Sequence, residues 1–334
     1  MICVVLAIEN LPAFTLGCYG GTEFETPYFD LLSSAGVTFN WHFADSIASV
    51  NKHHPWMTGD HTFFYTPSDK SPLMKERLEN AGVHVVIQNE ELPVCQNSFS
   101  ELITQATETL QQLISSTSNQ PTLFWLNAQG VSGKTELKDE VKQLDTDARA
   151  LIEFLLNANQ AEEILFVMTA ARGAVDLPQI NALEKSPLPE SLVHTPLIFV
   201  SPLLGSSERR QELVQTIDLL PTIEDWLTQQ SARNQSDGKS LWQILKNETS
   251  KNKNWREAIY IKSSDNTFAV RTDRFYLIED KATQEDAANS FFPNLFLYVK
   301  PDDLWDIYNV ANQSPQVVEE LHHQQQVFFS NVES

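Results

Sequence analysis

The sequence predicts an α/β protein: a doubly wound, mostly parallel sheet with helices on both faces, followed by a small α+β carboxyl-terminal subdomain. The chain opens on a continuous apolar run, which is typical of a strand buried on both faces of a parallel sheet. Further short apolar runs then alternate with segments of helical periodicity. After a polar stretch at 231–240, short apolar runs follow one another with little between them, which indicates a different architecture.

The first strand ends in polar residues. Seven apolar residues, 2–8, lead directly into Glu9 and Asn10. In open α/β sheets ligands bind just beyond the carboxyl ends of the strands. Glu9 and Asn10 are therefore candidates for a site, although they could equally do no more than terminate the strand.

The elements that follow alternate in type. Helices are predicted at 71–80, 100–116, 136–157 and 211–226, and strands at 83–88, 122–126, 163–169 and 196–200. This alternation predicts βαβ units and a parallel sheet. Beyond it, short strands are predicted at 258–261, 267–271, 274–277 and 295–299, with a closing helix from Ser314. We therefore divide the chain into an α/β domain, 1–235, and an α+β subdomain, 236–334.

Composition narrows the classes of partner. The net charge is −21, and a polyanion repels nucleic acid and anionic membrane surfaces, so neither is an expected partner. Three cysteines, Cys3, Cys18 and Cys95, form no disulfide framework and have no metal-ligand spacing. No apolar run approaches the roughly 20 residues that span a bilayer, and no signal peptide precedes the first strand, which together predict a cytoplasmic protein.

Four segments near the amino terminus form a signature. They read LGCYG at 16–20, TPYFDLL at 26–32, AGVTF at 35–39 and TG at 58–59. In this order after a first strand, they resemble the sulfatases of the alkaline-phosphatase-like superfamily. The helix within the signature is physically sensible, because Thr26 can cap it, Pro27 suits its first turn and Gly36 can end it.

Later segments extend the resemblance over nearly the whole chain, although the chain is shorter than typical members. They read HTPLIFVSP, IDLLPTIEDWL, DGKSLW, AVRTDRFYLI and LWDIYNVANQSPQVVEEL. The resemblance implies an alkaline-phosphatase-like fold and hydrolysis of sulfate esters. Family members use calcium or magnesium held by Asp, Asn or His side chains, and a formylglycine nucleophile made from the Cys or Ser of a C/S-x-P-S-R motif.

Carried over by position, the resemblance places the metal ligands on Glu9 and Asn10. Counting back from the TG pair places the nucleophile on Ser49, although a shift in the loop would move it to Ser46. Asn51 stands where the motif has proline, and His53 stands where it has arginine. The motif that modifying enzymes recognise is therefore broken, and an unactivated serine hydroxyl is a poor nucleophile.

The largest departure follows the strand at 163–169. The family has SDHG there, whose acid binds metal, whereas this chain has AARG at 170–173. Arg172 would repel a divalent ion and could itself take the place of the cation. Lys185 matches the family's substrate-binding lysine, with an exposed lysine as the alternative. His53 is a weak candidate for contacting an anion, and His194 is expected to satisfy local hydrogen bonds rather than to bind metal.

A competing motif lies at 128–135. The residues AQGVSGKT fit a permissive phosphate-binding loop, since they follow a predicted strand and precede a predicted helix. The first position is alanine rather than glycine, and no later strand ends in the expected acid. Nucleotide binding is therefore the third hypothesis.

The sequence thus leaves three functional hypotheses. The favoured one is a non-catalytic sulfatase homologue, a pseudoenzyme or binding subunit whose metal site is eroded and which needs no cofactor. The second is a sulfuric or phosphoric ester hydrolase with a rearranged site of Glu9, Asn10, Ser49 and Lys185, which would require calcium or magnesium. The expected partner is an anionic ester ligand or another protein.

Overall fold

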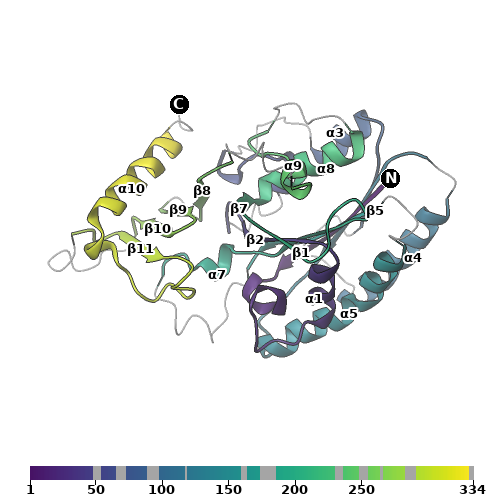
Figure 1. Ribbon diagram of the computed structural model, residues 1–334, viewed down its shortest axis with the longest axis horizontal. Helices are drawn as coiled ribbons and strands as arrows, with labels where there is room; N and C mark the ends of the chain where they lie inside the picture. Colours follow the sequence, from purple (N-terminus) through teal and green to yellow (C-terminus); the bar gives the residue numbers. More distant parts are fainter. Residues whose placement is uncertain are drawn as a thin grey trace.

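A computed structural model describes residues 1–47, 54–64, 73–88, 98–116, 119–158, 164–173, 186–229, 236–247, 255–263, 266–282 and 291–330. The described part contains a seven-stranded and a four-stranded sheet, which lie side by side with the short helix α7 (Glu190–Val193) between them (Figure 1). The predicted α/β architecture with an additional α+β part is therefore confirmed. None of the described helices is long and apolar enough to cross a lipid bilayer.

The larger sheet has β1 at its centre. Its strands run in the order β3 (His84–Gln88), β4 (Thr122–Ala128), β1 (Ile2–Asn10), β5 (Ile164–Arg172), β6 (Leu197–Val200), β2 (Val37–Phe43) and β7 (Glu208–Gln215). β1 pairs in parallel with both β4 and β5, and only β6 runs against its neighbours. The carboxyl ends of β1, β5 and β2 therefore lie at the same edge of the sheet.

Helices cover both faces of this sheet (Figure 1). The strand period of two sends Val4, Leu6 and Ile8 to one face, where they share a core with residues of α1 (Pro27–Ala35), α4 (Phe99–Ser115) and α5 (Leu137–Ala158). Cys3, Val5 and Ala7 point to the other face. There the core includes residues of α2 (His54–Thr58), α3 (Met74–Asn80), α8 (Leu219–Thr228) and α9 (Trp242–Leu245). The first strand is therefore buried on both sides, as its apolar run predicts.

One predicted helix is wrong over its first half. Residues 208–215 form β7, which pairs with β2 at the edge of the sheet, and α8 begins only at Leu219. The apolar residues Leu213, Val214 and Ile217 have a spacing that also fits a helix. Pairing with β2 overrides this local pattern because it buries Leu213 and Val214 in an extended conformation.

The start of α1 is also stabilised differently from the prediction. Pro27 occupies the first turn as expected, but the Thr26 side chain makes no capping bond to the helix and instead accepts a hydrogen bond from Gly17 N. The carboxylate of Asp145, on α5, accepts from the backbone N–H groups of Tyr28 and Phe29. A buried carboxylate from a distant helix therefore stabilises this helix end, which no local pattern reveals.

The smaller sheet is antiparallel, in the order β11 (Leu295–Val299), β10 (Phe275–Asp280), β9 (Thr267–Thr272) and β8 (Ala258–Lys262). The closing helix α10 (Pro315–Ser330) packs against it. These elements agree closely with the predicted ones. The division at residue 235 stays a prediction; α9, beyond that residue, contributes Ile244 and Leu245 to the core of the larger sheet.

Candidate functional site

The polar end of β1 lies at the carboxyl edge of the larger sheet, where ligands bind in open α/β folds. Glu9 is buried, Asn10 is half-buried, and Asn10 is paired in register with Arg172 at the end of β5. The chain packs closely here: Val131 N donates to Asn10 O, and a side chain at Gly130 would meet that oxygen at 1.8 Å. The backbone of this edge is therefore fixed by the sheet and by the loop after β4.

The Arg172 guanidinium contacts both residues in which β1 ends. Its Nε donates to Asn10 Oδ1 at 2.8 Å, and its Nη2 lies 3.7 Å from Glu9 Oε1. Its Nη1 donates to the backbone oxygen of Ile47 at 3.3 Å. The Arg172 side chain is 15% exposed and that of Glu9 is 7% exposed, so solvent screens this ion pair only in part. Strand register brings these charges together, because Asn10 and Arg172 are direct neighbours in the sheet.

This edge does not suit a divalent cation. Calcium takes six to eight oxygen ligands and magnesium six, with several carboxylates among them. Ala170 and Ala171 supply no side-chain oxygen, and within the described ranges no group of three or more His, Cys, Asp or Glu side chains converges. The charge of Arg172 is already placed against Glu9 and Asn10, where an ion would have to bind. A second cation would therefore be repelled at short range.

Several residues proposed from the sequence cannot be placed. Ser49, His53 and Lys185 lie outside the described residues, as does Cys95. Their proposed roles stay predictions. Ser46, the alternative position for the nucleophile, is described and is 5% exposed.

His194 forms local interactions. Its Nε2 pairs with the backbone oxygen of Asn40 at 2.8 Å, and its ring stacks on Phe43 with ring centres 5.0 Å apart. Burial lowers the pKa of this imidazole, an effect that the nearby Glu190 carboxylate partly opposes. These contacts agree with the expectation of local hydrogen bonding. A role for His194 as a binding residue stays a prediction.

A carboxylate of the chain itself fills the candidate phosphate loop. Glu140, in the first turn of α5, accepts hydrogen bonds from the backbone N–H groups of Ser132, Gly133 and Thr135. Burial raises the pKa of Glu140, but these N–H groups outweigh it and hold the pKa below its ordinary value. A phosphate would need the same donors, so the structure argues against the nucleotide hypothesis. The loop pattern alone does not reveal this interaction, because Glu140 lies eight residues after Ser132.

Sequence reasoning missed another acid at the same edge. Asp45 follows the carboxyl end of β2 and is 1% exposed. Its carboxylate accepts from Thr62 N at 2.5 Å and from Thr62 Oγ1 at 3.0 Å, and it lies 3.6 Å from His61 Nδ1. The rule that identified Glu9 applies equally to Asp45, but it requires knowing that β2 runs parallel to β1. That direction is decided by the sheet as a whole.

Comparison with known proteins supports the fold. No family model matches the chain, and no curated protein matches its sequence. The chain resembles a protein solved in complex with its substrate D-glucosamine-2-N,6-O-disulfate, with a TM-score of 0.76, 12% identity, and coverage of 99% of this chain and 98% of that one. It also resembles the phosphonate monoester hydrolase of Agrobacterium radiobacter, with a TM-score of 0.73, 12% identity, and coverage of 99% and 95%.

A 2-O GAG sulfatase gives a TM-score of 0.72 at 14% identity, over 100% of this chain and 92% of that one. The alkaline-phosphatase-like fold expected from the sequence is therefore confirmed, with sulfatases and phosphonate monoester hydrolases among its structural neighbours. At these identities the likeness concerns the fold.

Proposed function

We propose that this chain is a non-catalytic protein of sulfatase fold, which acts by binding an anionic ester or a protein partner and does not hydrolyse esters. The observation that carries the proposal is the position of Arg172. Its guanidinium is bound by Asn10 and lies beside Glu9, the two residues that the resemblance assigns to a metal. This position supports the proposal, because a positive charge of the chain itself lies beside the residues that the resemblance assigns to a metal ion.

The chemistry of ester hydrolysis supports this proposal. Cleavage of a sulfate ester requires a positive group that is free to stabilise the negative charge developing on the ester oxygens. It also requires a strong nucleophile. An arginine tied to Asn10, Glu9 and a backbone carbonyl has much of its donor capacity committed within the protein. The broken motif around Ser49 removes the usual route to an activated nucleophile.

The second candidate is an ester hydrolase with a rearranged site of Glu9, Asn10, Ser49 and Lys185. Its support is that structural neighbours include a protein solved in complex with its substrate D-glucosamine-2-N,6-O-disulfate, a 2-O GAG sulfatase and a phosphonate monoester hydrolase. This candidate requires Glu9 to leave Arg172 and bind an ion. The two candidates therefore differ in whether the protein takes up calcium or magnesium.

The test is calorimetric titration of the metal-free protein with calcium and with magnesium, combined with thermal unfolding. The wild type should release no binding heat, and neither ion should raise its unfolding temperature, because stabilisation follows the ratio of ion concentration to dissociation constant. A rebuilt variant, Asn10→Asp with Ala171→Asp and Arg172→His, should gain binding. Arg149→Met, which removes an exposed arginine on α5, is the matched control and should behave as wild type.

Hydrolysis of aryl sulfates and aryl phosphates is measured on the same proteins. The wild type should show no turnover above buffer with either ion present. An unfolding temperature that rises with calcium or magnesium in the wild type but not in Glu9→Ala, accompanied by turnover, would overturn the proposal in favour of the hydrolase.

A further inference from the structure

Four charged side chains are buried together away from the candidate site. They are Glu190 of α7, Arg271 of β9, and Lys300 and Asp306 of the segment after β11, and none is more than 4% exposed. We refer to them as the buried charge cluster. Buried charges are costly unless paired, so such a group requires a physical account.

Within the buried charge cluster each carboxylate faces a cation. The Lys300 ammonium lies 2.9 Å from Glu190 Oε2 and 2.5 Å from Asp306 Oδ1, so it bridges the two acids. Arg271 contacts both oxygens of Glu190, at 3.3 and 3.4 Å. The backbone N–H of Glu190 donates to Asp306 Oδ2 at 2.7 Å. With both acids ionised the four charges sum to zero.

The buried charge cluster joins the two sheets. Its Glu190 belongs to α7, which is hydrogen-bonded to the larger sheet because Leu192 O accepts from Gly173 N, directly after Arg172. The other three members belong to the carboxyl-terminal part. Arg271 also lies 5.1 Å from the Trp41 ring of β2. The ion pairs of the cluster that cross this junction therefore both involve Glu190 of α7.

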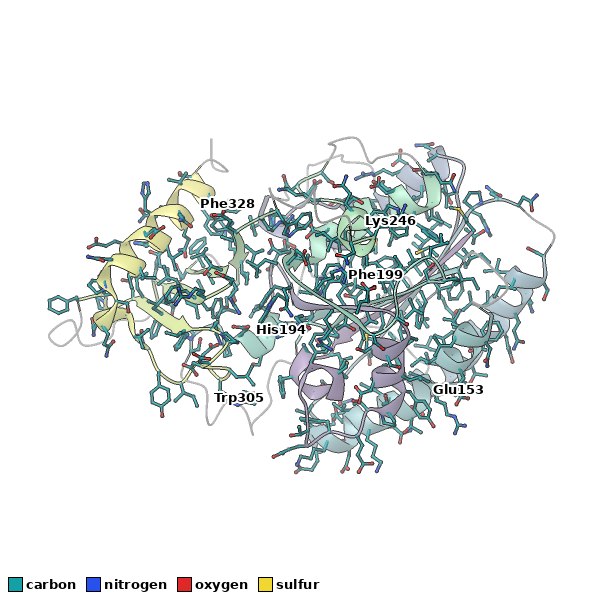
Figure 2. All side chains as sticks on the ribbon, in the orientation of Figure 1. Glu153, His194, Phe199, Lys246, Trp305 and Phe328 are labelled. Carbon is teal, nitrogen blue, oxygen red and sulfur yellow. The ribbon has the colours of Figure 1, made fainter. Side chains whose placement is uncertain are left out.

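Aromatic contacts mark the same junction. Trp305, next to Asp306, packs edge-on against Phe14 with ring centres 5.0 Å apart, and the Tyr276 hydroxyl donates to Leu188 O at 2.9 Å. Figure 2 shows Trp305 and His194 where the two parts of the molecule meet. Lys300 and Asp306 therefore lie within an interface, where a change of charge acts on the docking of one part against the other.

Asp306 is the less compensated of the two acids. Glu190 faces two cations, whereas Asp306 faces Lys300 and one backbone N–H. Its backbone is also in the left-handed region, with φ of 53°, which few residues other than glycine adopt without strain. Burial raises the pKa of Asp306 to about 7; Lys300 opposes this rise and the negative charge of Glu190 adds to it.

Three other charged or titratable groups lie in or around the cluster, each on a different element: Arg271 on β9, Tyr276 on β10 and His194 at the end of α7. Burial and the neighbouring acids hold the pKa of Tyr276 well above its ordinary value, and burial lowers that of His194. Tyr276 and His194 are therefore both neutral near pH 7, and they do not replace Asp306 as the group that changes charge there.

We propose that the buried charge cluster is a pH-sensitive latch between the two parts of the protein. Protonation of Asp306 strengthens the docking of one part against the other, and loss of that proton weakens it. The proton comes from solvent and binds one carboxylate oxygen of Asp306, with no other bond made or broken. With that proton in place, Glu190 is the one acid of the cluster that remains charged, and it faces both cations. Without it, a second buried carboxylate must be accommodated beside Glu190 at a desolvation cost.

The sign of the effect follows from linkage. The folded protein holds this proton up to about pH 7, whereas an unfolded chain releases it near pH 3.8. Unfolding therefore releases one proton in this window, and the folded state loses stability as pH rises through it. Between pH 5.5 and 8 the folding equilibrium constant should fall about 30-fold through this group alone.

The test is thermal unfolding and amide hydrogen exchange of the full chain between pH 5.5 and 8, with exchange corrected for its intrinsic pH dependence. The wild type should unfold at lower temperature at pH 8, and exchange in 186–194 and 295–310 should be faster there. Asp306→Asn should lose most of this difference. Asp302→Asn, which changes an exposed acid in the same segment, is the control and should keep it.

Wild type with an unfolding temperature and exchange that do not change from pH 5.5 to 8 would overturn the latch. So would an Asp306→Asn variant that retains the full wild-type dependence. If this variant does not fold, calorimetric unfolding of the wild type in buffers of different ionisation enthalpy decides the matter. Release of about one proton per molecule near pH 6 supports the latch, and release of none contradicts it.

Discussion

The carboxyl edge of the larger sheet and the buried charge cluster both pair acids with cations, but they do so differently. At the edge, one guanidinium lies 3.7 Å from Glu9 and is 15% exposed. In the cluster, Lys300 lies within 2.9 Å of two acids and is almost fully buried. Proximity and burial set how much such a pair matters for stability. The comparison therefore indicates that the ion pairs of the cluster contribute more to stability than the pair at the edge of the sheet.

The origin of each arrangement also differs. At the edge, strand register places Arg172, the last residue of β5, directly beside Asn10. In the cluster, Glu190 lies between 81 and 116 residues before its three partners, and folding of both parts is needed to bring them together. A substitution at the edge should thus change the affinity for the proposed anionic ester or protein partner more than the free energy of unfolding. A substitution in the cluster should do the reverse.

The largest effect should come from Lys300→Met. This change leaves Glu190 and Asp306 buried with Arg271 as their remaining cation, and breaking a buried pair in this way costs about 3–5 kcal/mol. Urea unfolding at pH 7 measures the loss. Lys138→Met removes an exposed pair with Glu23, which solvent screens, and should cost far less than Lys300→Met. Equal losses in the two variants would contradict the contrast between buried and exposed pairs.

Arg172→Met should have a smaller effect on stability. It removes the guanidinium from Asn10 and Glu9, and the loss of a hydrogen bond to a charged group costs about 1–3 kcal/mol. Urea unfolding measures this loss, and Arg149→Met is the matched control. If Arg172→Met were more destabilising than Lys300→Met, the distinction between a site and a structural cluster would not hold.

The free energy of unfolding should also decrease at acidic pH, and we refer to this decrease as the acid limb of the stability profile. Burial raises the pKa of Glu190, but Arg271 and Lys300 outweigh burial and hold it below the ordinary value of 4.5. Its stabilisation is therefore present above pH 4.5 and is lost as pH falls below that value, by at most about 1.4 kcal/mol per pH unit. Because Asp306 acts in the opposite direction, stability should be greatest at mildly acidic pH.

Thermal unfolding from pH 3 to 6 measures this limb. Glu190→Gln should be destabilised at pH 6 and should show a flatter acid limb than wild type. Glu153→Gln, which removes an exposed acid of α5, should leave the slope unchanged. An unchanged slope in Glu190→Gln would assign the acid limb to other carboxylates.

The smallest effect should come from Glu140→Gln. This acid is hydrogen-bonded to an exposed loop, and losing such a helix-terminal interaction costs about 1 kcal/mol. Hydrogen exchange in 130–140 should become faster while the rest of the chain is unchanged. Titration of this variant with inorganic phosphate tests whether the Glu140 carboxylate prevents phosphate from binding the loop. Phosphate binding by the wild type would contradict the conclusion that Glu140 occupies the N–H groups of the loop.

The sequence by itself determined the fold class, the central strand and most element types. Burial on both faces of a parallel strand demands an apolar run, and residues 2–8 provide one whatever surrounds them. It also showed Arg172 next to the position where the resemblance expects a metal-binding acid, because the order of residues at the end of β5 is local information. Only the tertiary structure decided that 208–215 is a strand, since its pairing with β2 outweighs a local pattern that fits a helix.

Tertiary structure alone also decided which charges meet. The sequence contains Glu140 and the loop at 128–135, but only the fold places the carboxylate on the N–H groups of that loop. Likewise, nothing local links Glu190 to Lys300 or Asp306, which lie 110 and 116 residues away along the chain. Electrostatic energy depends on the distance between charges and on their burial, and the separation of two residues in the sequence gives neither quantity. For this reason the fold could be predicted from the sequence, whereas the charge pairs described above could not.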